Sequence, residues 1–126
     1  MAPGLVVRSA NNAIALDLDG DGIEQTGWVL VYLHLGMDGL VSPGTQVVQD
    51  EPLGHPSCQG GNATGKHVHI ARKYNGEWLS ADEPLPLFLS GWQVITYEGN
   101  YQGALMRGEE LLTPDANGQR ISYIQR

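Results

Sequence analysis

Short apolar runs, alternating with polar residues and separated by turn residues, recur along the whole chain. Glycine, proline and dipeptides such as Asp38-Gly39 and Asn75-Gly76 mark the turns, and Asn-Gly is a pair that tight β-hairpins prefer. The apolar runs are rich in Val, Ile, Leu and aromatic residues, and none keeps the 3.6-residue period of an amphipathic helix. The pattern predicts strands over residues 5–8, 13–18, 28–35, 46–48, 66–74, 77–79 and 92–97.

The predicted fold class is therefore all-β, a small antiparallel sheet or sandwich of short strands. The best helical candidate is a single turn over residues 85–89, beside two prolines. With 126 residues and 41% apolar content, the chain suits one compact domain, whose core is predicted over residues 1–99. Residues 100–126 form a more polar tail that could add one hairpin, with residues 121–124 as a weak strand.

Two histidines stand two residues apart on one predicted strand. Side chains at i and i+2 of a strand point to the same face, so His67 and His69 suit one metal site. His34 is expected to share a face of its own strand with Tyr32, and it would join the pair if the two strands lie close in the sheet. For an arbitrary His-x-His pair, two half-exposed histidines on a solvated face are the commoner outcome.

The charge balance narrows the class of partner. Fourteen acidic residues against seven basic ones give a net charge of −7, which argues against nucleic acid. No apolar run approaches the roughly 20 residues that span a bilayer, and the start at Met1-Ala2-Pro3-Gly4 lacks the features of a secretory signal. A single cysteine, Cys58, cannot form a disulfide within the chain. The sequence thus predicts an acidic, soluble and monomeric domain.

Two further motifs contain residues of the kinds that bind metal ions. The stretch from Asp17 to Gly22 begins like a calcium loop, but its twelfth position is Trp28 where a bidentate glutamate is required. A polar hairpin tip is the expected structure there, with adventitious Ca²⁺ as the alternative. His55 and Cys58 have the spacing of half a zinc site, but a second pair is missing, so a surface loop is expected.

Three segments in a fixed order carry a family resemblance. They are a Tyr-x-His-Leu strand within residues 27–35, the segment at residues 41–48, and Thr-Gly-x-His-x-His within residues 64–70. Together they resemble the core of lysostaphin-type zinc endopeptidases, the LytM and LasA (β-lytic) group of metallopeptidases. The ordered pairing of the two histidine segments is specific, whereas neither half alone would be, and the resemblance extends over residues 3–92.

The resemblance implies a fold with a groove, one Zn²⁺ and cleavage of peptides in bacterial cell-wall peptidoglycan, by a secreted or cell-envelope protein. His69 matches the zinc ligand of the His-x-His motif. His34 and His67 match the two catalytic histidines that orient and deprotonate the attacking water and stabilise the oxyanion. The residues expected to border the substrate groove are Tyr32, Asn62, Thr64 and Gly65.

The family pattern also includes two zinc ligands that this sequence lacks at the matching place. They form a His-x-x-x-Asp motif before the strand matched here by residues 4–7, and no histidine precedes His34. The resemblance therefore predicts two further ligands upstream of Met1. Because one histidine cannot hold a catalytic zinc, these 126 residues are expected to be inactive alone.

Two other functional classes compete with the peptidase. One is a non-catalytic LytM-like module that uses the same groove to bind cell-wall peptide or a partner amidase. The other is a biotinyl- or lipoyl-type carrier, which shares short strands but needs a modified lysine at an exposed hairpin tip. The expected tip at Asn75-Gly76 has no lysine, so the carrier is the weakest of the three.

Overall fold

The computed structural model describes residues 2–63, 65–82, 84–98, 102–114 and 124. Within them it has β-strands and no helix, and all the strand pairs are antiparallel, which confirms the all-β class. No helix in this part of the chain is long and apolar enough to cross a membrane. The chain divides into two units, Met1–Leu79 and Ser80–Arg126.

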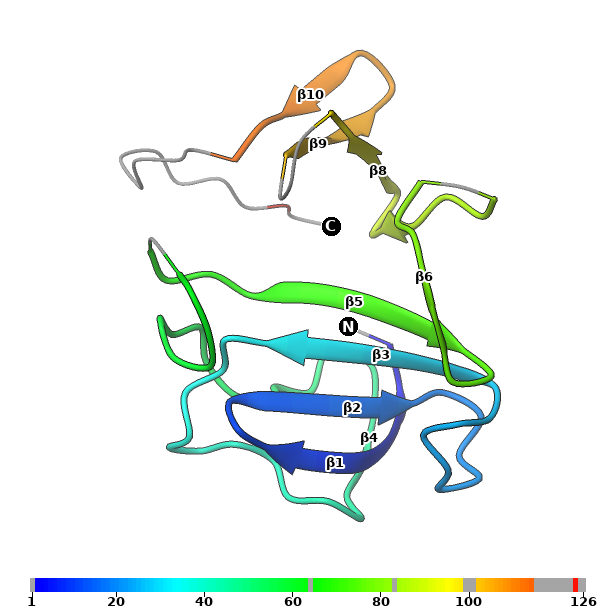
Figure 1. The fold of residues 1–126 in the computed structure, drawn as a ribbon, viewed down its shortest axis with the longest axis vertical. Helices are drawn as coiled ribbons and strands as arrows, with labels where there is room; N and C mark the ends of the chain where they lie inside the picture. Colours follow the sequence, from blue (N-terminus) through cyan, green and yellow to red (C-terminus); the bar gives the residue numbers. More distant parts are fainter. Residues whose placement is uncertain (1, 64, 83, 99–101, 115–123, 125–126) are drawn as a thin grey trace. The chain divides into compact units, whose positions relative to one another are not determined.

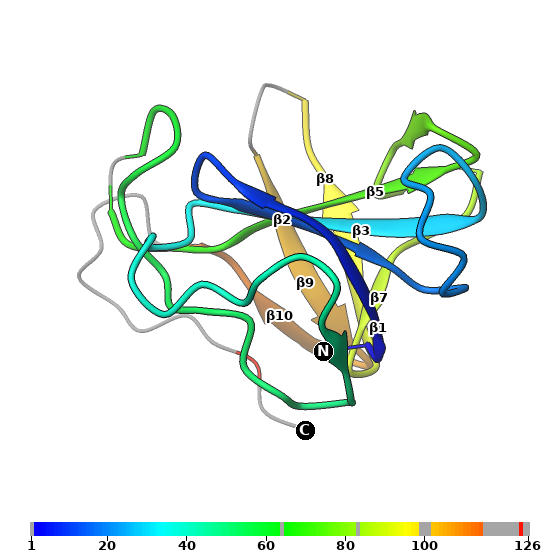
Figure 2. The same ribbon diagram turned by 90° about the horizontal axis from the view of Figure 1, so that it is seen from below.

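The first unit is built on a six-stranded sheet with the order β4-β1-β2-β3-β5-β6. In both views β1, β2, β3 and β5 run side by side (Figure 1 and Figure 2). The strands of this sheet are β1 (Gly4–Ala10), β2 (Ala13–Asp17), β3 (Trp28–Leu33), β4 (Gln46–Val47), β5 (His69–Tyr74) and β6 (Glu77–Leu79).

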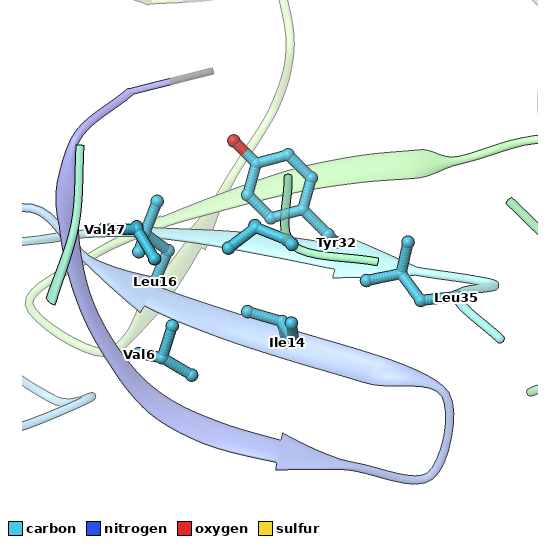
Figure 3. Close-up of a cluster of buried hydrophobic side chains, with 7 residues drawn as sticks. Val6, Ile14, Leu16, Tyr32, Leu35 and Val47 are labelled. Carbon is cyan, nitrogen blue, oxygen red and sulfur yellow. The ribbon is translucent and has the colours of Figure 1, made fainter. Parts of the chain in front are cut away.

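The sheet buries apolar side chains on both faces, as its period-2 pattern requires. On one face lies a cluster of seven buried residues: Val6, Ile14, Leu16, Tyr32, Leu35, Val47 and Leu53 (Figure 3). On the other, Ala15, Val29 and Val31 are almost completely buried. Each fully buried Val, Leu or Ile contributes about 1.5–3 kcal/mol, so these two clusters are the main source of stability in the first unit.

Two tight turns fix the register of the hairpins. Asn75 and Gly76 join β5 to β6 with φ angles of 49° and 82°, the left-handed pair expected from this dipeptide. Asn11 and Asn12 join β1 to β2 with φ angles of 52° and 63°. Asparagine tolerates this conformation better than most residues, which explains a pair of asparagines at the tip.

The second unit contains a four-stranded sheet with the order β10-β9-β8-β7. Its strands are β7 (Phe88–Leu89), β8 (Trp92–Thr96), β9 (Gly103–Arg107) and β10 (Glu110–Leu112). The predicted helical turn over residues 85–89 is wrong, because Phe88 and Leu89 pair with β8 instead. The β9–β10 hairpin lies within the polar tail, whereas the weak strand expected at residues 121–124 falls largely outside the described residues.

Candidate active site

Three of the four histidine rings gather where β3 ends and β5 begins, at the left-hand ends of these strands in Figure 1. The ring centroids of His34 and His67 are 4.6 Å apart, and those of His34 and His69 are 6.3 Å apart. The predicted convergence of the three histidines is therefore present in the structure. The strands bring it about because β3 and β5 are hydrogen-bonded neighbours.

The route by which His34 reaches the cluster differs from the prediction. His69 lies opposite Leu33 in the sheet, so an extended strand would direct the next side chain, His34, to the opposite face together with Tyr32. The strand instead ends at Leu33, and His34 has a left-handed φ of 62°. This turn of the backbone brings its ring to the other two histidines, so the expectation that Tyr32 and His34 share a face is wrong.

A loop at residues 55–61 supports this unusual backbone. The carbonyl oxygen of His34 accepts hydrogen bonds from the backbone N–H of Ser57 at 2.7 Å and from its hydroxyl at 3.0 Å. Ser57 also forms a β-bridge with His67, and Pro56 forms one with Leu35. One short segment thus holds both His34 and His67 by their backbones.

Backbone carbonyls also fix two of the imidazole rings. Nδ1 of His34 lies 2.9 Å from the carbonyl oxygen of Gln59, and Nδ1 of His67 lies 2.9 Å from that of Gly65. A carbonyl can only accept, so in both rings Nδ1 carries the hydrogen and, in the neutral ring, Nε2 presents its lone pair. That tautomer suits a proton acceptor and also a metal ligand.

Burial differs among the three histidines. His34 is only 7% exposed, His69 is half-buried and His67 is exposed. Burial lowers the pKa of His69, and the neighbouring His34 and His67 lower it further. His69 therefore favours the neutral form, which is the form that binds a metal ion.

The expected groove residues are in different environments. Tyr32 is 8% exposed within the core cluster, and burial raises the pKa of its hydroxyl to about 12. Its side chain therefore packs in the core cluster. Asn62 is exposed and Gly65 is half-buried, whereas Thr64 lies outside the described residues. A Cβ atom on Gly61 would lie 3.3 Å from Cε1 of His34, so this loop does border the site.

Among the described residues, the three histidines do not form a close group of candidate metal-ligand atoms. In this part of the chain, three candidate ligand atoms lie within 4.8 Å of one another only in Asp17, Asp19 and Asp21. The chemistry of the three histidines fits zinc, but their geometry supplies only part of a zinc site. The Asp17 carboxylate accepts hydrogen bonds from the backbone N–H groups of Asp19, Gly20 and Gly22. Asp17 therefore closes the loop between β2 and β3, and this structural role explains why the three aspartates lie together.

His55 and Cys58 are both exposed in the loop that follows Gly54, as expected. Sequence analysis missed the residues that support the site, Ser57, Gln59 and Asn12. The Asn11-Asn12 pair carried a turn signal that was available from the sequence. Gln59 acts on His34 through its backbone carbonyl, which leaves no signature in the residue type.

Comparison with known proteins gives two similarities. No family model matches the chain. Protease LasA of Pseudomonas aeruginosa, in strains PAO1 and UCBPP-PA14, is 40% identical over 63 residues, which cover 44% of this chain and 15% of the relative. The solved structure of pseudoalterin, an M23 metalloprotease from the deep sea, matches with a TM-score of 0.66 and 20% identity, over 89% of this chain and 66% of that one.

The chain is similar to LasA over part of its length, and its fold is similar to that of an M23 metalloprotease. It spans only about 15% of the length of the curated relatives that it matches, and the pseudoalterin likeness concerns the fold. The similarities therefore support the all-β fold, and membership of the M23 metallopeptidases is a proposal. The ligand and catalytic roles of His34, His67 and His69 are proposals, which the site geometry informs.

Proposed function

We propose that this chain is the core of an M23-type, zinc-dependent endopeptidase acting on the peptide part of bacterial peptidoglycan, outside the cell or at its envelope. The observation that carries the proposal is the cluster of His34, His67 and His69 at the ends of β3 and β5. The similarity to a protease, LasA, supports a hydrolytic role for that cluster.

We assign His69 as one zinc ligand, because its pKa is lowered and its ring is half-buried. A catalytic zinc site requires two further protein ligands beside His69. His34 and His67 take the proton-handling roles, since Nε2 of each can accept a proton from water. In its protonated form, either ring could then donate a hydrogen bond to the developing oxyanion.

The substrate assignment rests on the small residues around the site. The positive φ angles of Gly60 and Gly61, 78° and 139°, let the backbone pass close to Asn12 at Gly60 and close to His34 at Gly61. Neither residue brings a side chain to the site, so a peptide with small residues, glycine above all, would have room beside the histidines. Peptide stems or cross-bridges fit this description better than glycan strands do.

Digestion of purified sacculi by the protein at its natural length, loaded with zinc, tests the proposal. Mass spectrometry of the muropeptides should find new free amino and carboxyl termini. New reducing sugars with intact peptides would instead show glycosidic chemistry and would refute the assignment.

One observation favours a second candidate, a non-catalytic module that binds cell-wall peptide or a partner amidase. Of the three clustered histidines only His69 is assigned to the metal, so the described residues supply one of the three ligands that a catalytic zinc needs. A protein that binds peptidoglycan peptides, or stimulates an amidase, but releases no new termini at its natural length would support this candidate over the peptidase.

A further inference from the structure

Asn12, at the tip of the β1–β2 hairpin, ties together the two segments that flank His34. Its amide Nδ2 donates to the carbonyl oxygen of Leu35 at 2.8 Å and to the side-chain oxygen of Gln59 at 2.9 Å. The backbone carbonyl of Asn12 accepts from the N–H of Leu35 at 2.9 Å. Asn12 therefore contacts the residue next to His34 in the chain and the residue whose carbonyl holds the ring of His34.

Close packing accompanies these hydrogen bonds. A Cβ atom on Gly60 would lie 2.6 Å from Cβ of Asn12, so the loop passes the hairpin tip with no room for a side chain. Gln59 therefore contacts Asn12 through its side chain and the His34 ring through its backbone carbonyl, and the next residue, Gly60, packs against Asn12.

The left-handed backbone of the β1–β2 turn does not by itself explain why the side-chain amide of Asn12 makes hydrogen bonds. Asn11 has a similar left-handed φ of 52° and meets the same conformational demand. Its side chain is exposed and makes no hydrogen bond among the described residues, whereas that of Asn12 makes two. The comparison with Asn11 thus shows that the hydrogen bonds of the Asn12 side chain are additional to its place in the turn.

We propose that Asn12 is a positioning residue for His34: through Gln59 and Leu35 it holds the carbonyl that keeps the His34 ring in its Nδ1–H form, with Nε2 directed to the site. The structural part of this proposal stands on the hydrogen bonds of the chain itself. Its catalytic consequence rests on the function proposed above, in which His34 handles a proton. Partners that orient a metal-binding histidine are typically worth about 10–100-fold in activity, and we expect an effect of that order for a histidine that handles a proton.

The test compares two matched variants, Asn12→Asp and Asn11→Asp. Both keep the size of the side chain and a residue that tolerates left-handed φ, but Asn12→Asp replaces the amide donor with a carboxylate. Long-range ¹H–¹⁵N spectra of the full chain report which nitrogen of His34 carries the hydrogen. We expect the Nδ1–H form in the wild type and in Asn11→Asp, and a mixture of tautomers in Asn12→Asp.

A folded Asn12→Asp variant in which His34 keeps the wild-type tautomer would overturn the proposal. If that variant does not fold, Gln59→Ala decides, because it removes the side-chain acceptor and leaves the carbonyl in place; an unchanged His34 tautomer there would also overturn it. In the active, natural-length protein, Asn12→Asp should lower kcat about tenfold with little change in KM. Failure of the peptidase proposal would remove only this last measurement, since the tautomer is read without substrate.

Discussion

A single backbone angle decides where the key histidine points. The sequence predicts that His67 and His69 share a face, because a period of two is a property of any strand, and this part of the site could be read in advance. The left-handed φ of His34 could not, because it depends on hydrogen bonds from Ser57, which lies 23 residues later in the chain. Local sequence carries no signal for a partner at that distance.

The three histidines should respond differently to substitution in the natural-length, zinc-loaded protein. His69→Ala is expected to lose metal and activity together. His34→Ala and His67→Ala should keep the metal and lose about 10²–10⁴ in kcat, the usual value of a positioned acid or base. Metal analysis together with steady-state kinetics checks this. Zinc release from His67→Ala with retention in His69→Ala would reverse the assignment.

At the scale of elements, the loops determine how well the site is held. Sequence patterns predicted the long strands β1, β2, β3 and β5, whose apolar alternation is clear. They allowed for one hairpin in the polar tail but did not place β9 and β10, and they mistook the two-residue β7 for a helical turn. Such short strands are specified by their partners in the sheet and not by their own sequence. The loop at residues 55–61 shows the same dependence on distant partners.

Gly60→Ala should destabilise the first unit more than a matched glycine substitution. Gly60 has a φ of 78°, and an added Cβ would meet Cβ of Asn12 at 2.6 Å. Gly39→Ala is the control, since its φ of 71° gives a similar backbone cost and its Cβ would meet nothing within 4 Å. We expect Gly39→Ala to cost about 1 kcal/mol and Gly60→Ala about 1–3 kcal/mol more, measured by denaturant unfolding. Equal costs for both variants would show that the loop can move away from the hairpin.

An ion-pair network joins the loop after β2 to the sheet and should make stability depend on pH. Glu24 pairs with Arg8 at 2.8 Å and with Lys73 at 2.9 Å. The hydrogen bond from Arg8 leads the interactions that lower the pKa of Glu24 from 4.5 to about 2. Because the folded-state pKa is depressed, the stabilisation is present above pH 4.5 and is lost as the pH falls towards 2.

Glu24→Gln should therefore unfold more easily at neutral pH and lose this part of the acid dependence. Water screens the pair, since the Arg8 side chain is 42% exposed, so the expected loss is about 1 kcal/mol. Glu110→Gln is the control: its pair with Arg107 is 3.2 Å long and both side chains are well exposed, so little change is expected. Thermal unfolding across pH 2–7 measures both. If the stability of Glu24→Gln and of the wild type changed with pH in the same way, the ion-pair network would not be the source of the acid dependence.

At the scale of the whole molecule, the fold and the histidine cluster do not by themselves amount to a metal site. The 126-residue chain is therefore expected to hold well under one Zn²⁺ after dialysis against a weak chelator, as measured by elemental analysis. Full occupancy would mean that carboxylates such as Asp17, or a second chain, complete the coordination. His69→Ala on the same chain distinguishes these cases, because zinc bound at the Asp17 loop alone would persist in it.

The bridges made by Ser57 and Pro56 also determine where residues can be inserted or deleted between His34 and Gln59. Residues 37–39 form an exposed tip between His34 and the loop at residues 55–61, and chain can be added or removed there without disturbing a hydrogen bond to the site. Between Ser57 and Gln59 the count is fixed, because one residue holds the His34 backbone and the residue two places later holds its ring. A single inserted residue there would move one of the two contacts out of register. Natural variation in length is therefore expected at the tip, with a constant spacing in the supporting loop.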